Sequence, residues 1–166
     1  MLNRQFGFTI AAIVFALDQL TKWIVAGPLE LQSVRQIVLL PIFNLSWTEN
    51  NGISLGLLNA ETEVGRWMLV ALTGAIAIGV AVWLGREKQR GDQIALGMVL
   101  GGALGNILDR IRFGYVVDFA DLHFGAFRPF LVFNVADAAI SIGVVILLLR
   151  AFLIRDERPK ENVEHA

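Results

Sequence analysis

Four long apolar segments constrain the fold of this chain more than any other feature. They cover residues 6–25, 64–84, 93–108 and 136–152, and each approaches the length of about 20 residues that a helix needs to cross a bilayer. Hydrophobic residues make up 55% of the 166 residues and charged residues only 17%, a composition too apolar for a soluble domain of this size. The sequence therefore predicts an all-α membrane protein with four transmembrane helices.

The basic residues beside these segments predict the orientation of the helices. If the chain crosses four times, they all fall on one side: Arg4, Arg86, Lys88, Arg90, Arg150, Arg155, Arg158 and Lys160. By the positive-inside rule this side is cytoplasmic. Residues 1–166 are then one membrane domain with both termini inside, a cytoplasmic tail over 153–166, and long outer connections over 26–63 and 109–135.

The first apolar segment is expected to be retained as a helix. It carries Asp18 and Lys22 within its apolar stretch, and no small-x-small cleavage site follows it. A cleavable secretory signal peptide instead has an apolar stretch without such charges, followed by a small-x-small cleavage site.

Several kinds of chemistry are excluded or disfavoured by composition. The chain has no cysteine and only two histidines, His123 and His165, which have no partner at ligand spacing. Disulfides, thiol nucleophiles and thiolate metal sites are therefore excluded, and a zinc site is disfavoured. The net charge of −1, without a basic face, gives no case for nucleic acid. We expect neither a metal nor a cofactor, and no obligate protein partner is evident.

The first outer connection contains a pattern of alternating residues. Phe43, Leu45 and Trp47 alternate with polar residues, and Asn50-Asn51-Gly52 follows. A period of two ending in such a turn favours a short strand with one apolar side, so that a small sheet lies on the membrane surface. An interfacial loop anchored by Trp47 explains the same residues equally well.

Polar residues on three of the predicted helices are expected at the same outer level of the membrane. On the first helix Asp18 and Lys22 are spaced i, i+4. At the outer end of the third helix Asn106, Asp109 and Arg110 share one face, and Asp137 lies at the start of the fourth. Each group has a structural explanation, an intrahelical ion pair or a cation at a helix C-terminus. Their common depth, however, favours a shared polar site. The glycines at 97, 101 and 105 predict close helix packing.

Two further aspartates lie beside apolar runs. Asn134 has the position of an N-cap, so Asp137 is explained as the acidic residue of a capping box about as well as by catalysis. Asp118 follows Val116-Val117 and precedes Phe119, and it has neither a local cation nor a helix to cap. A carboxylate beside hydrocarbon is costly and marks a functional site by default.

Five motifs of the chain resemble, in order, those of the lipoprotein signal peptidases, or signal peptidase II. They are Asp18-Gln-Leu-Thr-Lys22, Glu49-Asn-Asn-Gly-Ile-Ser54, Gly101-Gly-Ala-Leu-Gly-Asn-Ile-Leu-Asp-Arg110, Val116-Val-Asp-Phe119 and Phe133-Asn-Val-Ala-Asp137. The resemblance implies a bacterial inner-membrane aspartic endopeptidase that cuts prolipoproteins before a diacylglyceryl-modified cysteine. Its partners are then these prolipoproteins and membrane lipids.

The resemblance also implies roles for individual residues. Asp118 and Asp137 match the catalytic pair, on the outer side of the membrane. Residues matching the surrounding positions are Asp18, Lys22, Asn50, Gly52, Asn106, Asp109, Arg110 and Asn134. The chain has Ile53-Ser54-Leu55 where the family often has Ala-Ala-Phe, which affects the substrate-facing shape of the loop.

Three other functions are compatible with parts of the sequence. A Ser/Lys peptidase needs a serine near Lys22, but none of Ser33, Ser46, Ser54 and Ser141 lies in a nucleophile-like motif. A small transporter would have its ionisable groups near mid-bilayer, whereas here they cluster toward the outer surface. A purely structural helix partner explains the glycines but leaves Asp118 without a role.

Overall fold

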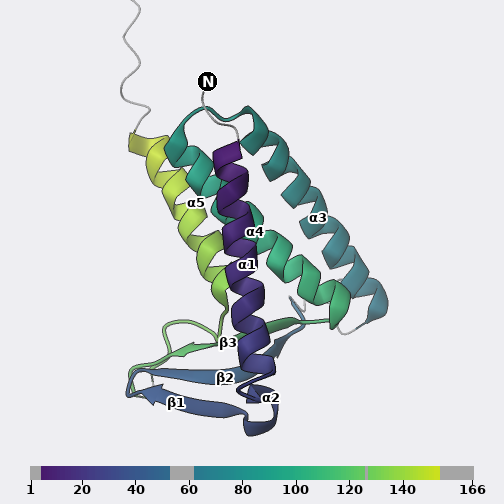
Figure 1. The fold of residues 1–166 in the computed structure, drawn as a ribbon, viewed down its shortest axis with the longest axis vertical. Helices are drawn as coiled ribbons and strands as arrows, with labels where there is room; N and C mark the ends of the chain where they lie inside the picture. Colours follow the sequence, from purple (N-terminus) through teal and green to yellow (C-terminus); the bar gives the residue numbers. More distant parts are fainter. Residues whose placement is uncertain (1–4, 53–61, 126, 154–166) are drawn as a thin grey trace, which may run out of the picture.

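The computed structural model describes residues 5–52, 62–125 and 127–153. It contains a helical bundle with a small antiparallel sheet at one end (Figure 1). The four long helices are α1 (Gln5–Ala26), α3 (Glu63–Arg86), α4 (Arg90–Arg112) and α5 (Val135–Leu153), and each is long and apolar enough to span a membrane. The predicted four-helix membrane architecture is confirmed, and the protein is a multi-pass membrane protein.

Helix α4 is the centre of the bundle and packs against α1, α3 and α5. Its glycines explain the close approach: a Cβ atom at Gly97, Gly101 or Gly105 would overlap atoms of α1, and one at Gly102 would overlap α5. The glycine ridge that the sequence predicted therefore packs helix against helix. In a bilayer such contact is a main source of helix association, because lipid tails are as apolar as the side chains themselves.

The sheet is formed by β1 (Gln36–Leu40), β2 (Phe43–Asn50) and β3 (Val116–Leu122) in that spatial order, with all pairs antiparallel. The short helix α2 (Leu31–Val34) precedes it. Leu45 and Trp47 of β2 pack with Val117 and Phe119 of β3 and with Val25 at the end of α1. Of the two interpretations of residues 43–48, the strand is confirmed, and the interfacial loop anchored by Trp47 is wrong, since Trp47 is buried.

The structure corrects the expected ends of the third helix. The sequence pattern indicated residues 93–108, but α4 continues to Arg112, so Asp109 and Arg110 lie on the helix and not in the outer connection. Gly114 adopts φ +91° and its N–H donates to the Arg110 carbonyl, an arrangement typical of a helix C-terminus. The helix thus ends at its glycine cap and not where the apolar run ends.

Two expected features lie at least partly beyond the part of the chain that the structure describes. The tail expected over 153–166 is described only at Leu153, and Ile53-Ser54-Leu55 lie outside the described residues.

The start of α1, the α3–α4 connection and the end of α5 all lie at the end of the bundle away from the sheet (Figure 1).

Candidate active site

Asp118 and Asp137 are joined through a chain of asparagines. Asp118, on β3, is 1% exposed, and its two oxygens accept hydrogen bonds from Nδ2 of Asn134 (2.7 Å) and Nδ2 of Asn50 (2.9 Å). Asp137, in the first turn of α5, accepts from Nδ2 of Asn106 at 2.8 Å. Asn134 in turn donates to Oδ1 of Asn106 at 3.1 Å. The helix bundle and the sheet each supply one of the two carboxylates.

Each of these three asparagines is oriented by a group that can only donate. The Oδ1 atom of Asn50 accepts from the Gly52 N–H, that of Asn106 from Lys22 Nζ, and that of Asn134 from the Asp137 N–H. Because a carbonyl oxygen must face such a donor, the NH₂ group of each side chain is directed the other way, toward an aspartate. The aspartates are therefore surrounded by neutral donors of fixed orientation.

Gly52 contributes through its backbone. Its φ of +97° lies in a region that glycine enters without steric cost, and in this conformation its N–H reaches Asn50 at 2.9 Å. The backbone of Gly52, just after β2, thus orients the side chain that binds Asp118.

The predicted cap of the last helix is present. Oδ1 of Asn134 accepts from the Asp137 N–H at 2.8 Å, and Oδ2 of Asp137 accepts from the Asn134 N–H at 3.3 Å. This reciprocal pair is a capping box, which satisfies two N–H groups at the start of α5. Capping and membership of the polar site are not alternatives, because Asp137 uses its other oxygen to accept from Asn106.

Burial and the neighbouring Asp137 carboxylate raise the pKa of Asp118 from 3.8 to about 7. Burial has the larger effect, since it removes water that would solvate the charged form. The hydrogen bonds from Asn50 and Asn134 act in the opposite direction. Asp118 therefore holds or releases a proton close to neutral pH.

A second group of buried charges lies beside the aspartates. Lys22 is 4% exposed, and its Nζ atom lies 2.8 Å from Asp18 and 2.7 Å from Asp109. The i, i+4 pair of Asp18 and Lys22 is thus formed, but it also extends to α4. The expectation that polar groups of separate helices meet in one site is met by these contacts.

Arg110 is near the aspartates without bonding to them. It interacts electrostatically with Asp137 and Asp118, and its Nε atom is buried with no hydrogen-bond partner among the described residues. No ion pair joins it to either carboxylate in the part of the chain that the structure describes.

Gln19 is a member of the cluster that the sequence interpretation missed. Its Nε2 atom donates to both Asp18 and Asp109 at 3.1 Å. The available signal was its position in α1, because Gln19 precedes Lys22 by three residues and so lies on the same face of the helix.

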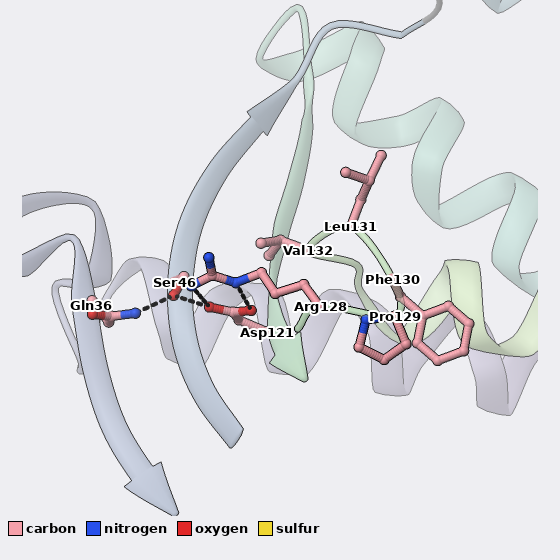
Figure 2. Close-up of a pocket in the computed structure, with 8 residues that line it drawn as sticks. All are labelled: Gln36, Ser46, Asp121, Arg128, Pro129, Phe130, Leu131 and Val132. Carbon is pink, nitrogen blue, oxygen red and sulfur yellow. Dashed lines mark hydrogen bonds and ion pairs between the residues drawn. The ribbon is translucent and has the colours of Figure 1, made fainter. Parts of the chain in front are cut away.

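A further buried carboxylate, Asp121, lies on β3 outside this network. Arg128 and Ser46 occupy its oxygens, with Arg128 Nε at 3.0 Å, and Gln36 donates to Ser46 (Figure 2). These residues line a pocket of about 450 Å³ together with Pro129, Phe130, Leu131 and Val132. Asp121 differs from Asp118 in having a cation as a direct partner.

Comparison with known proteins identifies the family. A sequence model described as Signal peptidase (SPase) II matches residues 10–153. The chain is 58% identical over 153 residues to a lipoprotein signal peptidase of Sphingopyxis alaskensis, covering 92% of this chain and 88% of the relative. For a lipoprotein signal peptidase of Rhizorhabdus wittichii the identity is 55% over 164 residues, covering 98% and 95%.

Solved structures agree with this assignment. A bacterial membrane enzyme determined by the in meso method at 1.9 Å resolution superposes with a TM-score of 0.75 at 29% identity, covering 89% of this chain and 92% of that chain. Another, at 2.3 Å, gives a TM-score of 0.74 at 28% identity and covers 93% and 94%. The chain belongs to the signal peptidase II family, the peptidases that remove signal peptides from prolipoproteins.

Proposed function

We propose that this protein is an aspartic endopeptidase that cleaves prolipoproteins immediately before a diacylglyceryl-modified cysteine, using Asp118 and Asp137 to activate water. The observation that carries the proposal is the linkage of the two carboxylates through Asn134 and Asn106, with Asn50 also bonded to Asp118. Within the described residues no cation is bonded to either carboxylate. Family membership supports the substrate class.

The proposed mechanism assigns one proton to the pair. Asp137 in its ionised form takes a proton from water, whose oxygen attacks the scissile carbonyl carbon. Asp118, with its pKa near 7, donates a proton to the carbonyl oxygen. As the C–N bond of the tetrahedral intermediate breaks, the proton held by Asp137 passes to the departing amine nitrogen, and Asp118 regains its proton from a hydroxyl group of the intermediate. Two close carboxylates suit this reaction because repulsion disfavours the doubly charged state.

The surrounding residues fit supporting roles. Asn50, Asn106 and Asn134 orient the two carboxylates. Asp18 and Asp109 hold the backbone beside the pair, and Lys22 binds the side chain of Asn106. The uncommitted Nε of Arg110, which interacts electrostatically with both aspartates, suits a substrate carbonyl or a lipid oxygen. In the rival Ser/Lys mechanism Lys22 would contact a serine, but its partners in the described structure are Asp18, Asn106 and Asp109.

The decisive experiment replaces single carboxylates in the purified protein. Asp118→Asn and Asp137→Asn should each lower the cleavage rate of a lipidated prolipoprotein in detergent micelles by about 100- to 10,000-fold, which is the usual contribution of a general acid or base. Asp121→Asn is the matched control, because it removes a buried carboxylate from the same strand without touching the pair. Substantial turnover by a folded Asp118→Asn or Asp137→Asn protein would refute the proposal.

The specificity for lipid is tested with paired substrates. A prolipoprotein without diacylglycerol on its cysteine should show a kcat/KM lower by about 100-fold or more in the same micelles, because each buried methylene contributes about 0.8 kcal/mol to anchoring. Large aromatic side chains exposed around the sheet end of the bundle, Phe113, Phe124, Phe127 and Phe130, suit contact with the headgroup region. Equal rates for both substrates would contradict lipid recognition.

The proposed location is the bacterial inner membrane, with both termini in the cytoplasm and the aspartates toward the outer side. The basic residues at the α3–α4 connection and on α5 lie at the end of the bundle opposite the sheet (Figure 1), which supports this orientation. Reporter fusions after Gly91 and at the C-terminus should report cytoplasm, and fusions near Glu61 and Gly125 the outer side. A C-terminus on the outer side would contradict the orientation.

A further inference from the structure

Asp18 and Asp109 each hold the backbone beside one of the proposed catalytic aspartates. Oδ1 of Asp18 accepts from the Ala136 N–H at 3.0 Å, immediately before Asp137. Oδ2 of Asp109 accepts from the Val117 N–H at 3.2 Å, immediately before Asp118. Both carboxylates are fully buried, with 0% exposure. Any relative shift of Asp18 and Asp109 is therefore passed to the two residues of the pair.

Two side chains of a single turn of α1 bridge these carboxylates. Lys22 Nζ lies between Asp18 Oδ2 and Asp109 Oδ2 at 2.8 and 2.7 Å. Gln19 Nε2 donates to Asp18 Oδ2 and to Asp109 Oδ1, each at 3.1 Å. The Gly105 carbonyl lies 3.4 Å from the same Nε2 atom. Helix α1 is thus joined to α4 at the level of the aspartates.

The two bridges differ in what they can fix. An ammonium group compensates charge but is a point charge on a flexible stem, which tolerates rotation of its partners. The NH₂ group of glutamine is planar, and its two hydrogens point in fixed directions, here toward one carboxylate each. Gln19 therefore sets the angle between Asp18 and Asp109, whereas Lys22 compensates their charge.

The packing of α1 on α4 leaves room for this arrangement. Gly105 lies against the carboxylate of Asp18, and a Cβ atom at this position would overlap it. A glycine here lets Asp18 reach past α4 to Ala136 on α5, so that the bridge connects three helices and, through Val117, the sheet.

We propose that Gln19 is a positioning residue for the cleavage reaction: by bonding Asp18 and Asp109 together, it sets the relative placement of Asp118 and Asp137. This role rests on the proposed function of the pair. A misplacement of about 1 Å in a reacting group is enough to lower a rate about 100-fold. Gln19 touches neither proposed catalytic carboxylate in the described structure, so it acts through its two partners.

The test measures kcat and KM separately for Gln19→Met, which keeps the length of the side chain and removes both donors. We expect kcat to fall about 10- to 100-fold with KM changed less than about 3-fold, because lost placement affects the reaction and not ground-state binding. The matched control is Gln93→Met. Gln93 is likewise a glutamine of a membrane helix, more deeply buried than the partly buried Gln19, but it bonds the Glu87 carbonyl at the opposite end of the bundle. The kcat of Gln93→Met should therefore stay within about 3-fold of the wild type.

A second variant covers the case in which Gln19→Met does not fold. Gln19→Asn keeps the amide and shortens the side chain by one methylene, so that it cannot bond both carboxylates at once, and the same loss of kcat is expected. Thermal unfolding in detergent reports folding for every variant.

The outcomes separate this inference from the proposed function. A wild-type kcat in folded Gln19→Met or Gln19→Asn, with Asp118→Asn and Asp137→Asn inactive, overturns the positioning role alone. Turnover by the aspartate variants overturns the pair and the positioning role together. A fall of kcat in Gln93→Met equal to that in Gln19→Met also overturns the positioning role, because the loss then follows from removing a glutamine amide from any membrane helix.

Discussion

Buried carboxylates in two neighbouring parts of this protein, Asp18 and Asp109 in one and Asp118 in the other, have opposite kinds of partner. Asp18 and Asp109 share the ammonium group of Lys22 at 2.8 and 2.7 Å. Among the described residues, Asp118 instead accepts from the side-chain amides of Asn50 and Asn134, and no cation forms an ion pair with it there. Burial alone therefore does not decide what a carboxylate does here.

The difference shows how one polar site can both hold structure and transfer protons. A cation beside a buried carboxylate compensates its charge and occupies its oxygens with hydrogen bonds. Neutral donors orient a carboxylate while leaving its pKa high, and the pKa of Asp118 is raised to about 7. A group that titrates near neutral pH inside a polar site is suited to acid or base catalysis. Three of the following predictions change one side of this comparison, and the last tests an exposed ion pair for contrast.

Removing the shared cation should have the largest effect on stability. Lys22→Met leaves Asp18 and Asp109 buried side by side without compensation, and we expect the free energy of unfolding to fall by about 3–5 kcal/mol. Equilibrium unfolding in detergent measures this free energy. Lys88→Met, which removes a cation from the exposed α3–α4 connection, should change stability by less than about 0.5 kcal/mol. Equal stability of the two variants would contradict the structural role of Lys22.

The raised pKa of Asp118 predicts a pH-dependent loss of stability. Between pH 3.8 and about 7 the folded protein holds a proton on Asp118 that the unfolded chain has released, so stability decreases as pH rises through this window and levels off above it. The contribution reaches at most about 4 kcal/mol. Unfolding of wild type and Asp118→Asn at several pH values measures it. The variant should lack this decrease, and parallel curves would contradict the raised pKa.

Loss of Asn134 should affect both stability and the pH profile. Asn134→Ala removes the cap of α5, which costs about 0.5–2 kcal/mol. It also removes a hydrogen bond that lowers the pKa of Asp118, so the alkaline limb of the rate profile should move to higher pH. Thr62→Ala is the control, since it removes the cap of α3 and should leave that limb in place. An unmoved alkaline limb in Asn134→Ala would mean that Asn134 does not affect the pKa of Asp118.

The smallest effect is expected at an exposed ion pair. Glu63 and Arg66 lie 3.5 Å apart with the Glu63 side chain 80% exposed, and such pairs contribute little because water screens them. Glu63→Gln should change stability by less than about 0.5 kcal/mol in the same unfolding assay. A larger loss would mean that charge pairing, irrespective of burial, supports this fold.

Much of the architecture was predictable because it depends on local composition. The four apolar segments predicted the four helices, since a bilayer accepts a spanning segment only when its backbone is hydrogen-bonded internally. The Asn134–Asp137 cap was predictable for a similar reason, because both partners lie within one turn. The sheet was predicted in part: the alternation around Trp47 indicated β2, whereas residues 116–119, which form much of β3, read only as an apolar stretch. A strand buried on both faces has no alternation to detect.

The sequence by itself determined the class of the protein, its membrane helices and, by resemblance, the residues of its polar site. Only the tertiary structure decided how these residues divide into a cluster paired with Lys22 and a pair bonded by amides. The bonding of Gln19 was likewise decided only by the tertiary structure, because its partner on α4, Asp109, lies 90 positions away in sequence. Periodicity describes which face of a helix a residue occupies, but the hydrogen-bond partner across that face exists only when the helices pack, because a buried donor must bond whatever acceptor the neighbouring element presents.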